Sequence, residues 1–174
     1  MSSPDNPNPD TRGATWAFLV LRLWLGARTL LSGVEKFSER ITVQEPLRDA
    51  NGVPDPSGAV VEIQKKVYGL GHYRAVAESL QTKFSQEPLL PPFLTTPFYA
   101  MLGYALVALG LMLLLGLWTR LSLVLAGILY TILTLGLLLI RQEDGVAWLG
   151  IQIGLIAFAL TLAGHNRFAL TRRC

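Results

Sequence analysis

The chain has 174 residues, of which 51% are hydrophobic and only 16% are charged. Soluble domains carry about 25% charged residues, and the charges here gather outside a few long apolar runs, which excludes an ordinary soluble domain. The net charge of +3 does not indicate a nucleic-acid partner, because no basic cluster with interleaved aromatic residues is present. We attribute the basic excess to membrane topology.

The first 13 residues are predicted to form a disordered cytoplasmic tail. The opening ten residues are acidic and rich in proline, and they lack the basic region that begins a signal peptide. Residues 14–174 are therefore expected to form a single membrane domain whose first apolar run stays in the mature protein.

Four apolar runs are predicted to cross the membrane. Each is close to the twenty helical residues that span the roughly 30 Å of hydrocarbon in a bilayer. We expect an all-α fold, an integral membrane four-helix bundle, with spans at about 15–34, 97–117, 121–140 and 146–164.

The lysines and arginines indicate the orientation of the bundle. Both tails and the tight turn at Arg120 carry basic residues in short segments, which the positive-inside rule places in the cytoplasm. Both termini are therefore expected in the cytoplasm, and the long polar segment 35–96 outside it.

Segment 35–96 is predicted to be an extracytoplasmic amphipathic insertion. Turn-forming residues fill positions 49–58, and a helical pattern follows from Val60 to about Phe84. We expect one or two amphipathic helices on the outer membrane face. The alternative is a docking surface for a partner protein.

Arg22 lies within the first span, where burying its charge costs about 2.5–3.5 kcal/mol on insertion scales. At 100° per residue it shares one helix face with Gly26, Thr29, Gly33 and Lys36. Small residues let neighbouring backbones approach closely, so this stripe is predicted to face the bundle. The same packing role is predicted for glycines of the second span and of the turn after it, namely Gly110 and Gly116.

The other three spans contain no aspartate or glutamate that could pair with Arg22. Its guanidinium could snorkel to the cytoplasmic face about 12 Å away. It could instead meet a lipid phosphate, a quinone carbonyl or an acid on another subunit. Within the chain, the candidate acceptors are backbone carbonyls and the side chains of Tyr104, Tyr130, Thr131 and Gln152.

The sequence does not predict a self-contained redox centre. His72 and His165 are expected on opposite sides of the membrane and cannot share a haem, and the only cysteine, Cys174, is the last residue. No metal and no covalently bound cofactor are expected. A quinone needs only an apolar slot and one or two donors, so the candidates for quinone or lipid contacts are Arg22, Tyr104, Tyr130, Gln152 and His165.

Several motifs resemble the DoxX/DoxD family of small four-helix membrane proteins. LRLWLG at Leu21–Gly26 and LSGVEKF at Leu31–Phe37 resemble the family's opening, and LLGLWTRL at Leu114–Leu121 resembles its second turn. HNRF at His165–Phe168 is similar to the end of some members. The resemblance implies a bacterial or archaeal cytoplasmic membrane protein with cytoplasmic termini, associated with redox systems.

One departure from the family pattern bears on function. Members carry a glutamate about four residues before the glycine that matches Gly110, whereas this chain has Leu106 there. We therefore expect a membrane subunit of a quinone-linked, respiratory-type oxidoreductase complex that anchors partner subunits and is not catalytic alone. The alternatives are the quinone-reducing small subunit of an enzyme like thiosulfate:quinone oxidoreductase, and a small-solute permease.

Overall fold

A computed structural model describes residues 9–47, 57 and 60–166 of the chain. The fold is mostly helical, and four of its helices are long and apolar enough to cross a membrane. These four helices coincide with the predicted spans to within a few residues at each end. They are α1 (Pro9–Glu35), α3 (Pro92–Leu115), α4 (Thr119–Leu139) and α5 (Glu143–Leu162).

Helix α1 begins inside the segment predicted to be a disordered tail. That prediction is wrong for residues 9–13, and residues 1–8 lie outside the described part of the chain. Pro9 suits the first helical position because its missing N–H has no intrahelical acceptor there.

The segment between α1 and α3 contains a β-hairpin, so the all-α prediction is wrong for this region. Strand β1 (Ser38–Pro46) pairs antiparallel with β2 (Val60–Tyr68), from Ser38 opposite Tyr68 to Pro46 opposite Val60. The helical interpretation fails over β2 because the strand is rich in β-branched residues, which favour extended backbone.

A shorter helix follows the hairpin. The 3₁₀ turn η1 (Leu70–His72) leads to α2 (Glu78–Gln86), which is the part of the predicted amphipathic helix that does form. Phe84 of α2 contacts the first turns of α3 at Tyr99, with ring centroids 6.2 Å apart, and lies beside Gly136 of α4. Helix α2 therefore folds back over the ends of α3 and α4.

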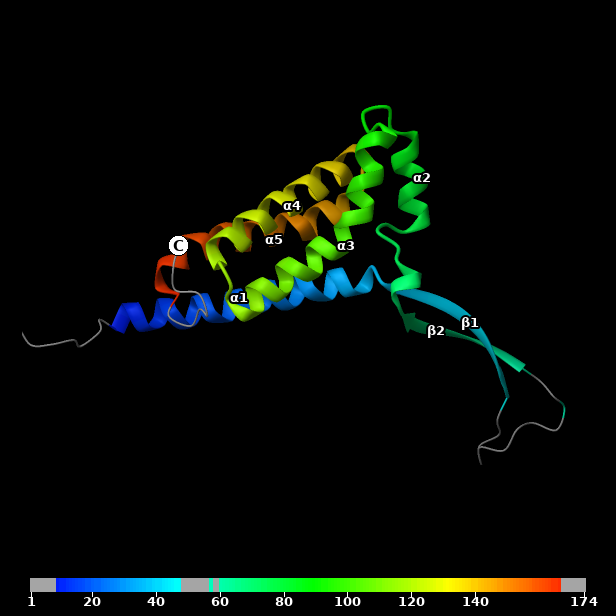
Figure 1. The fold of residues 1–174 in the computed structure, drawn as a ribbon, viewed down its shortest axis with the longest axis horizontal. Coiled ribbons are helices and arrows are strands. Elements are labelled where there is room, and N and C mark those ends of the chain that lie inside the picture. Colours follow the sequence, from blue (N-terminus) through cyan, green and yellow to red (C-terminus); the bar gives the residue numbers. More distant parts are fainter. Residues whose placement is uncertain (1–8, 48–56, 58–59, 167–174) are drawn as a thin grey trace, which may run out of the picture.

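The four long helices form a closed ring in which α1 packs mainly on α3 and α4 mainly on α5 (Figure 1). The start of α1 and the end of α5 lie at one end of this bundle, which we call the terminal end. The hairpin and α2 lie at the opposite end, the hairpin end.

Helices α1 and α3 are in close backbone contact at glycines. A β-carbon on Gly33 would lie 2.7 Å from the backbone nitrogen of Val107, and one on Gly110 would lie 2.5 Å from that of Leu30. A β-carbon on Gly26 would likewise meet α3 at 2.9 Å. Interatomic approaches this short exclude any side chain, so glycine determines the distance between the two helices.

Gly116 has a different role from the packing role predicted for it. Its φ of 71° is left-handed, and its N–H bonds back to Leu113 at the end of α3. A glycine adopts this conformation without the steric penalty that other residues incur. Gly116 therefore ends α3 and starts the tight turn into α4.

Candidate functional site

Arg22 lies inside the bundle with only 4% of its surface exposed. Its Nη1 donates to Oδ1 of Asn166 at 3.2 Å, and Nδ2 of Asn166 donates to Oγ1 of Thr119 at 2.9 Å. This chain of hydrogen bonds joins α1, the start of α4 and the segment after α5 at the terminal end. It gives a buried charge a neutral acceptor within the same chain.

Asn166 was not among the acceptors expected for Arg22. It follows the last helix, and its amide reaches Arg22 because α5 packs beside α1. The sequence did contain a signal, because Asn166 belongs to the HNRF motif at the end of the fourth span. A polar residue at the depth of a buried arginine is a natural acceptor for it.

A second polar contact lies deeper in the bundle. The hydroxyl groups of Thr29 and Tyr130 are 3.0 Å apart, and both side chains are buried. Thr29 lies seven residues beyond Arg22, or about 10 Å along α1. The pair links α1 to α4, which share no glycine contact.

We expect Tyr130→Phe to lower the free energy of unfolding by about 1 kcal/mol, because it removes this buried hydrogen bond and leaves the Thr29 hydroxyl without its partner. The control is Thr131→Val on the next residue of α4, which removes only an exposed hydrogen bond from this hydroxyl to the carbonyl of Gly127 in the same helix. Unfolding in mixed micelles measures both. Equal stability of the two variants would show that the buried pair contributes no more than this exposed bond.

The remaining predicted quinone contacts do not converge on Arg22. Tyr104 lies at the hairpin end against Phe37 and is 56% exposed. At 1.5 Å per helical residue, Phe37 is about 20 Å along the bundle from Arg22. Gln152 is buried on α5, and its Oε1 has no hydrogen-bond partner among the described residues. The side chain of His165 lies outside the described residues. Of the described members of the predicted set, Tyr104 thus lies far from Arg22, and Tyr130 bonds to Thr29 rather than to Arg22.

Aromatic side chains gather at the hairpin end around Tyr73. Its ring lies 5.0 Å from that of Phe37 and stacks on Tyr104 at 5.7 Å. Its hydroxyl donates to the carbonyl of Tyr99 and accepts the N–H of Gly103 at 3.1 Å. These contacts hold the segment after the hairpin against α3, a link that the sequence did not predict.

Ionic contacts join the hairpin to the segment behind it. Glu39 of β1 accepts from Nδ1 of His72 at 2.7 Å and from Arg74, while Lys66 of β2 lies 3.5 Å from Glu35. Burial lowers the pKa of Lys36, although the neighbouring Glu35 opposes this effect. We call residues 35–41 and 65–74 the junction.

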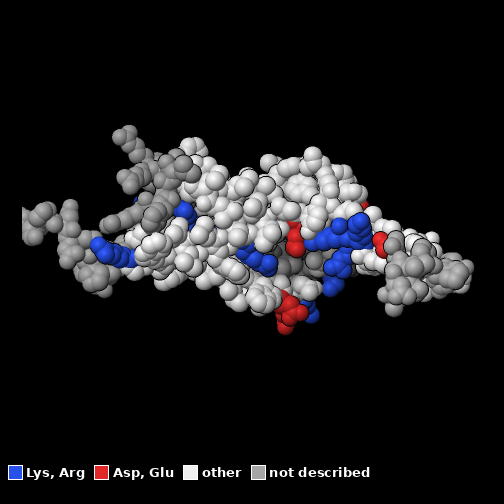
Figure 2. Space-filling model, turned by 90° about the horizontal axis from the view of Figure 1, so that it is seen from below, with Lys and Arg blue, Asp and Glu red and all other residues white. Residues whose placement is uncertain are grey.

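The junction is basic. It contains two acidic residues, Glu35 and Glu39, against five basic ones. Figure 2 shows lysine and arginine side chains concentrated where the bundle meets the hairpin. The basic residues are Lys36, Arg40, Lys65, Lys66 and Arg74.

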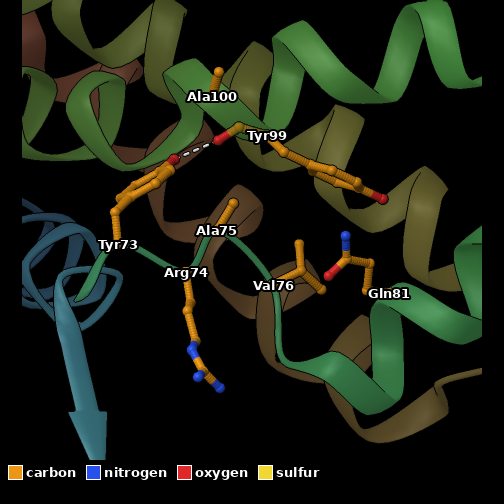
Figure 3. Close-up of a pocket in the computed structure, with 7 residues that line it drawn as sticks. All are labelled: Tyr73, Arg74, Ala75, Val76, Gln81, Tyr99 and Ala100. Atoms are coloured by element: carbon orange, nitrogen blue, oxygen red, sulfur yellow. Dashed lines mark hydrogen bonds between the residues drawn. The ribbon is translucent and has the colours of Figure 1, made fainter. Parts of the chain in front are cut away.

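A half-open cavity of about 290 Å³ lies beside the junction, between residues 73–76, α2 and the start of α3. In Figure 3 the ring of Tyr99 faces Gln81 and Val76, while Arg74 extends away from α3. The cavity combines apolar walls with a guanidinium, an amide and a phenol.

The described part of the chain contains no group of three or more histidine, cysteine, aspartate or glutamate residues that could hold a metal ion. Its fold defines a mostly helical protein with four helices able to cross a membrane. No protein-family model, curated protein or solved structure matches the chain. The DoxX/DoxD likeness therefore remains a prediction based on short motifs.

Proposed function

We propose that this protein is an integral membrane four-helix bundle that holds a partner subunit of a respiratory-type oxidoreductase complex through its hairpin. The outer faces of the long helices support membrane insertion. They expose a continuous series of large apolar side chains that water would solvate poorly and lipid would cover. Among them are Val20, Trp24, Leu111, Ile132, Ile151 and Phe158.

The proposed orientation places the terminal end in the cytoplasm of a bacterial or archaeal cell and the hairpin outside the cytoplasmic membrane. Arg12 and Arg120 support it, because both are exposed near short segments at the terminal end. In this orientation the hairpin extends from the bundle into the extracytoplasmic space, where a water-soluble subunit can reach it.

The hairpin is the observation that carries the proposal. Cross-strand neighbours share a face, so Val43 and Ile63 lie on one face, and Thr42 and Gln64 on the other. The first face carries five apolar residues beside Glu39, Glu45 and Lys65, and Ile63 on it is 44% accessible. Its other apolar members are Ile41, Val61 and Val67.

A two-stranded hairpin in water is marginally stable unless its apolar face is covered. The partner must therefore offer a complementary apolar surface outside the membrane. The resemblance of the opening motifs to the DoxX/DoxD family supports an oxidoreductase subunit that carries the redox cofactor itself. In this proposal the present chain supplies anchoring and no chemistry.

A photo-crosslinking amino acid placed at Ile63 or at Gln64 tests the proposal in native membranes. Because adjacent strand residues point to opposite faces, we expect the Ile63 probe to give roughly fivefold more adduct than the Gln64 probe. Mass spectrometry should identify the adduct as a cofactor-bearing oxidoreductase subunit. Equal adducts from both positions, or an adduct to a protein without redox function, would contradict the proposal.

A further inference from the structure

We propose that the cavity beside the junction binds one anionic phospholipid, with its phosphate at Arg74 and an acyl chain along α3. The inference rests on the proposed membrane insertion. It assigns a ligand class to a site that the partner-binding function does not use.

The cavity lies at the depth of lipid headgroups. The backbone N–H of Arg74 donates to the carbonyl of Lys36 at 2.7 Å, and Lys36 directly follows the apolar span that ends at Glu35. On the opposite wall, Tyr99 and Ala100 lie in the first turns of the span Thr95–Leu115. Both walls therefore stand where hydrocarbon gives way to the polar region of a bilayer.

The lining provides the donors that a phosphodiester needs. Gln81 presents an amide and Tyr99 a hydroxyl, while Arg74 presents a planar guanidinium with five N–H donors on the side of the cavity away from α3 (Figure 3). Glu39 bonds to Arg74 and holds its side chain at the junction. The cavity volume of about 290 Å³ is close to the lower limit of small-ligand sites, which suits a headgroup rather than a whole lipid.

An apolar path leaves the cavity along α3. Ala100 lines the cavity and is exposed, and residues three, four, seven or eight positions apart continue its face down the helix. Tyr104, four residues on, is 56% exposed on this path, which can accommodate an acyl chain inside the bilayer. The other exposed members are Ala108 and Leu111.

The charge of the junction determines which headgroup is preferred. Five basic residues against two acidic ones give a net charge of +3 when His72 is neutral. A zwitterionic headgroup gains little from this field, whereas an anionic one gains about 1 kcal/mol per nearby basic residue. Phosphatidylglycerol should therefore bind in preference to phosphatidylcholine.

Native mass spectrometry of the full-length protein, solubilised with equimolar phosphatidylglycerol and phosphatidylcholine, tests the inference. Since one basic residue near the headgroup corresponds to about fivefold in affinity, Arg74→Gln should lower the preference for phosphatidylglycerol by about that factor. Arg141→Gln removes the same charge at the hairpin end, between α4 and α5, without touching the cavity, and should leave the preference unchanged. Arg74→Lys should retain most of it.

Glu39→Gln provides a test of opposite sign. It removes the carboxylate that competes with phosphate for Arg74, so lipid retention should rise by roughly fivefold. A purely structural role of the Glu39–Arg74 pair predicts no rise. Water-soluble glycerol phosphate should not displace the lipid, because it lacks the acyl chain that lies along α3.

Alkaline extraction of membranes from the same variants separates the two proposals. If the wild-type protein is extracted, membrane insertion is wrong and the lipid site fails with it. If all variants stay in the membrane but Arg74→Gln retains as much phosphatidylglycerol as Arg141→Gln, only the lipid site is wrong. Displacement by glycerol phosphate would overturn the acyl path and leave a plain phosphate site.

Discussion

Replacing Gly110 by alanine is expected to lower the free energy of unfolding by about 3 kcal/mol, at the upper end of ordinary overpacking. The new β-carbon would lie 2.5 Å from the nitrogen and 2.6 Å from the α-carbon of Leu30. Both atoms belong to the backbone of α1 and cannot turn aside as a flexible side chain can. The two helices must therefore separate along their whole contact, which also loosens Gly26 and Gly33.

Gly154→Ala is the matched control for this change. Gly154 lies in α5, and a β-carbon there would meet nothing within 4 Å. Alanine favours a helix over glycine by up to about 1 kcal/mol, so this variant should be as stable as the wild type or slightly more so. Unfolding by sodium dodecyl sulfate in mixed micelles compares the two. If both variants unfolded alike, the close α1–α3 contact would not limit the stability of the bundle.

The long helices and the glycine contacts could be predicted because both are local properties of the sequence. A run of twenty apolar residues determines a long apolar helix whatever surrounds it. The spacing of Gly26, Thr29 and Gly33 places them on one face by helix geometry alone. The partner of that face was not specified, and the structure assigns it to α3 near Leu106 and Gly110.

The hairpin could not be predicted in the same way. Residues 60–68 contain enough apolar positions to fit a helix or a strand, and their pairing with Ser38–Pro46 depends on a segment more than ten residues away. The Glu39–Arg74 and Tyr73–Tyr99 contacts depend on that pairing in turn. Sequence patterns therefore could not predict the cavity that these contacts border. They could not predict the separation of Arg22 from Tyr104 either.

Asn166→Ala is expected to lower the free energy of unfolding by about 2 kcal/mol, because hydrogen bonds to charged groups contribute about 1.5–3 kcal/mol. The change removes the acceptor that Asn166 gives to Arg22 and the donor that it gives to Thr119. In an Arg22→Met background the same change should cost only about 0.5 kcal/mol, since no buried charge then needs the amide. A double-mutant cycle in micelles measures the difference.

Asn166→Asp tests whether Arg22 requires the asparagine side chain itself or only a hydrogen-bond acceptor at this position. It places a carboxylate beside Arg22. Helices α3, α4 and α5 contain no such acid beyond the first turn of α5. A charge-assisted hydrogen bond is stronger than the neutral one it replaces, so this variant should be at least as stable as the wild type. The gain should vanish in the Arg22→Met background, where the aspartate would be buried without a cation. Additive effects within about 0.5 kcal/mol would instead mean that Arg22 and Asn166 stabilise the bundle independently.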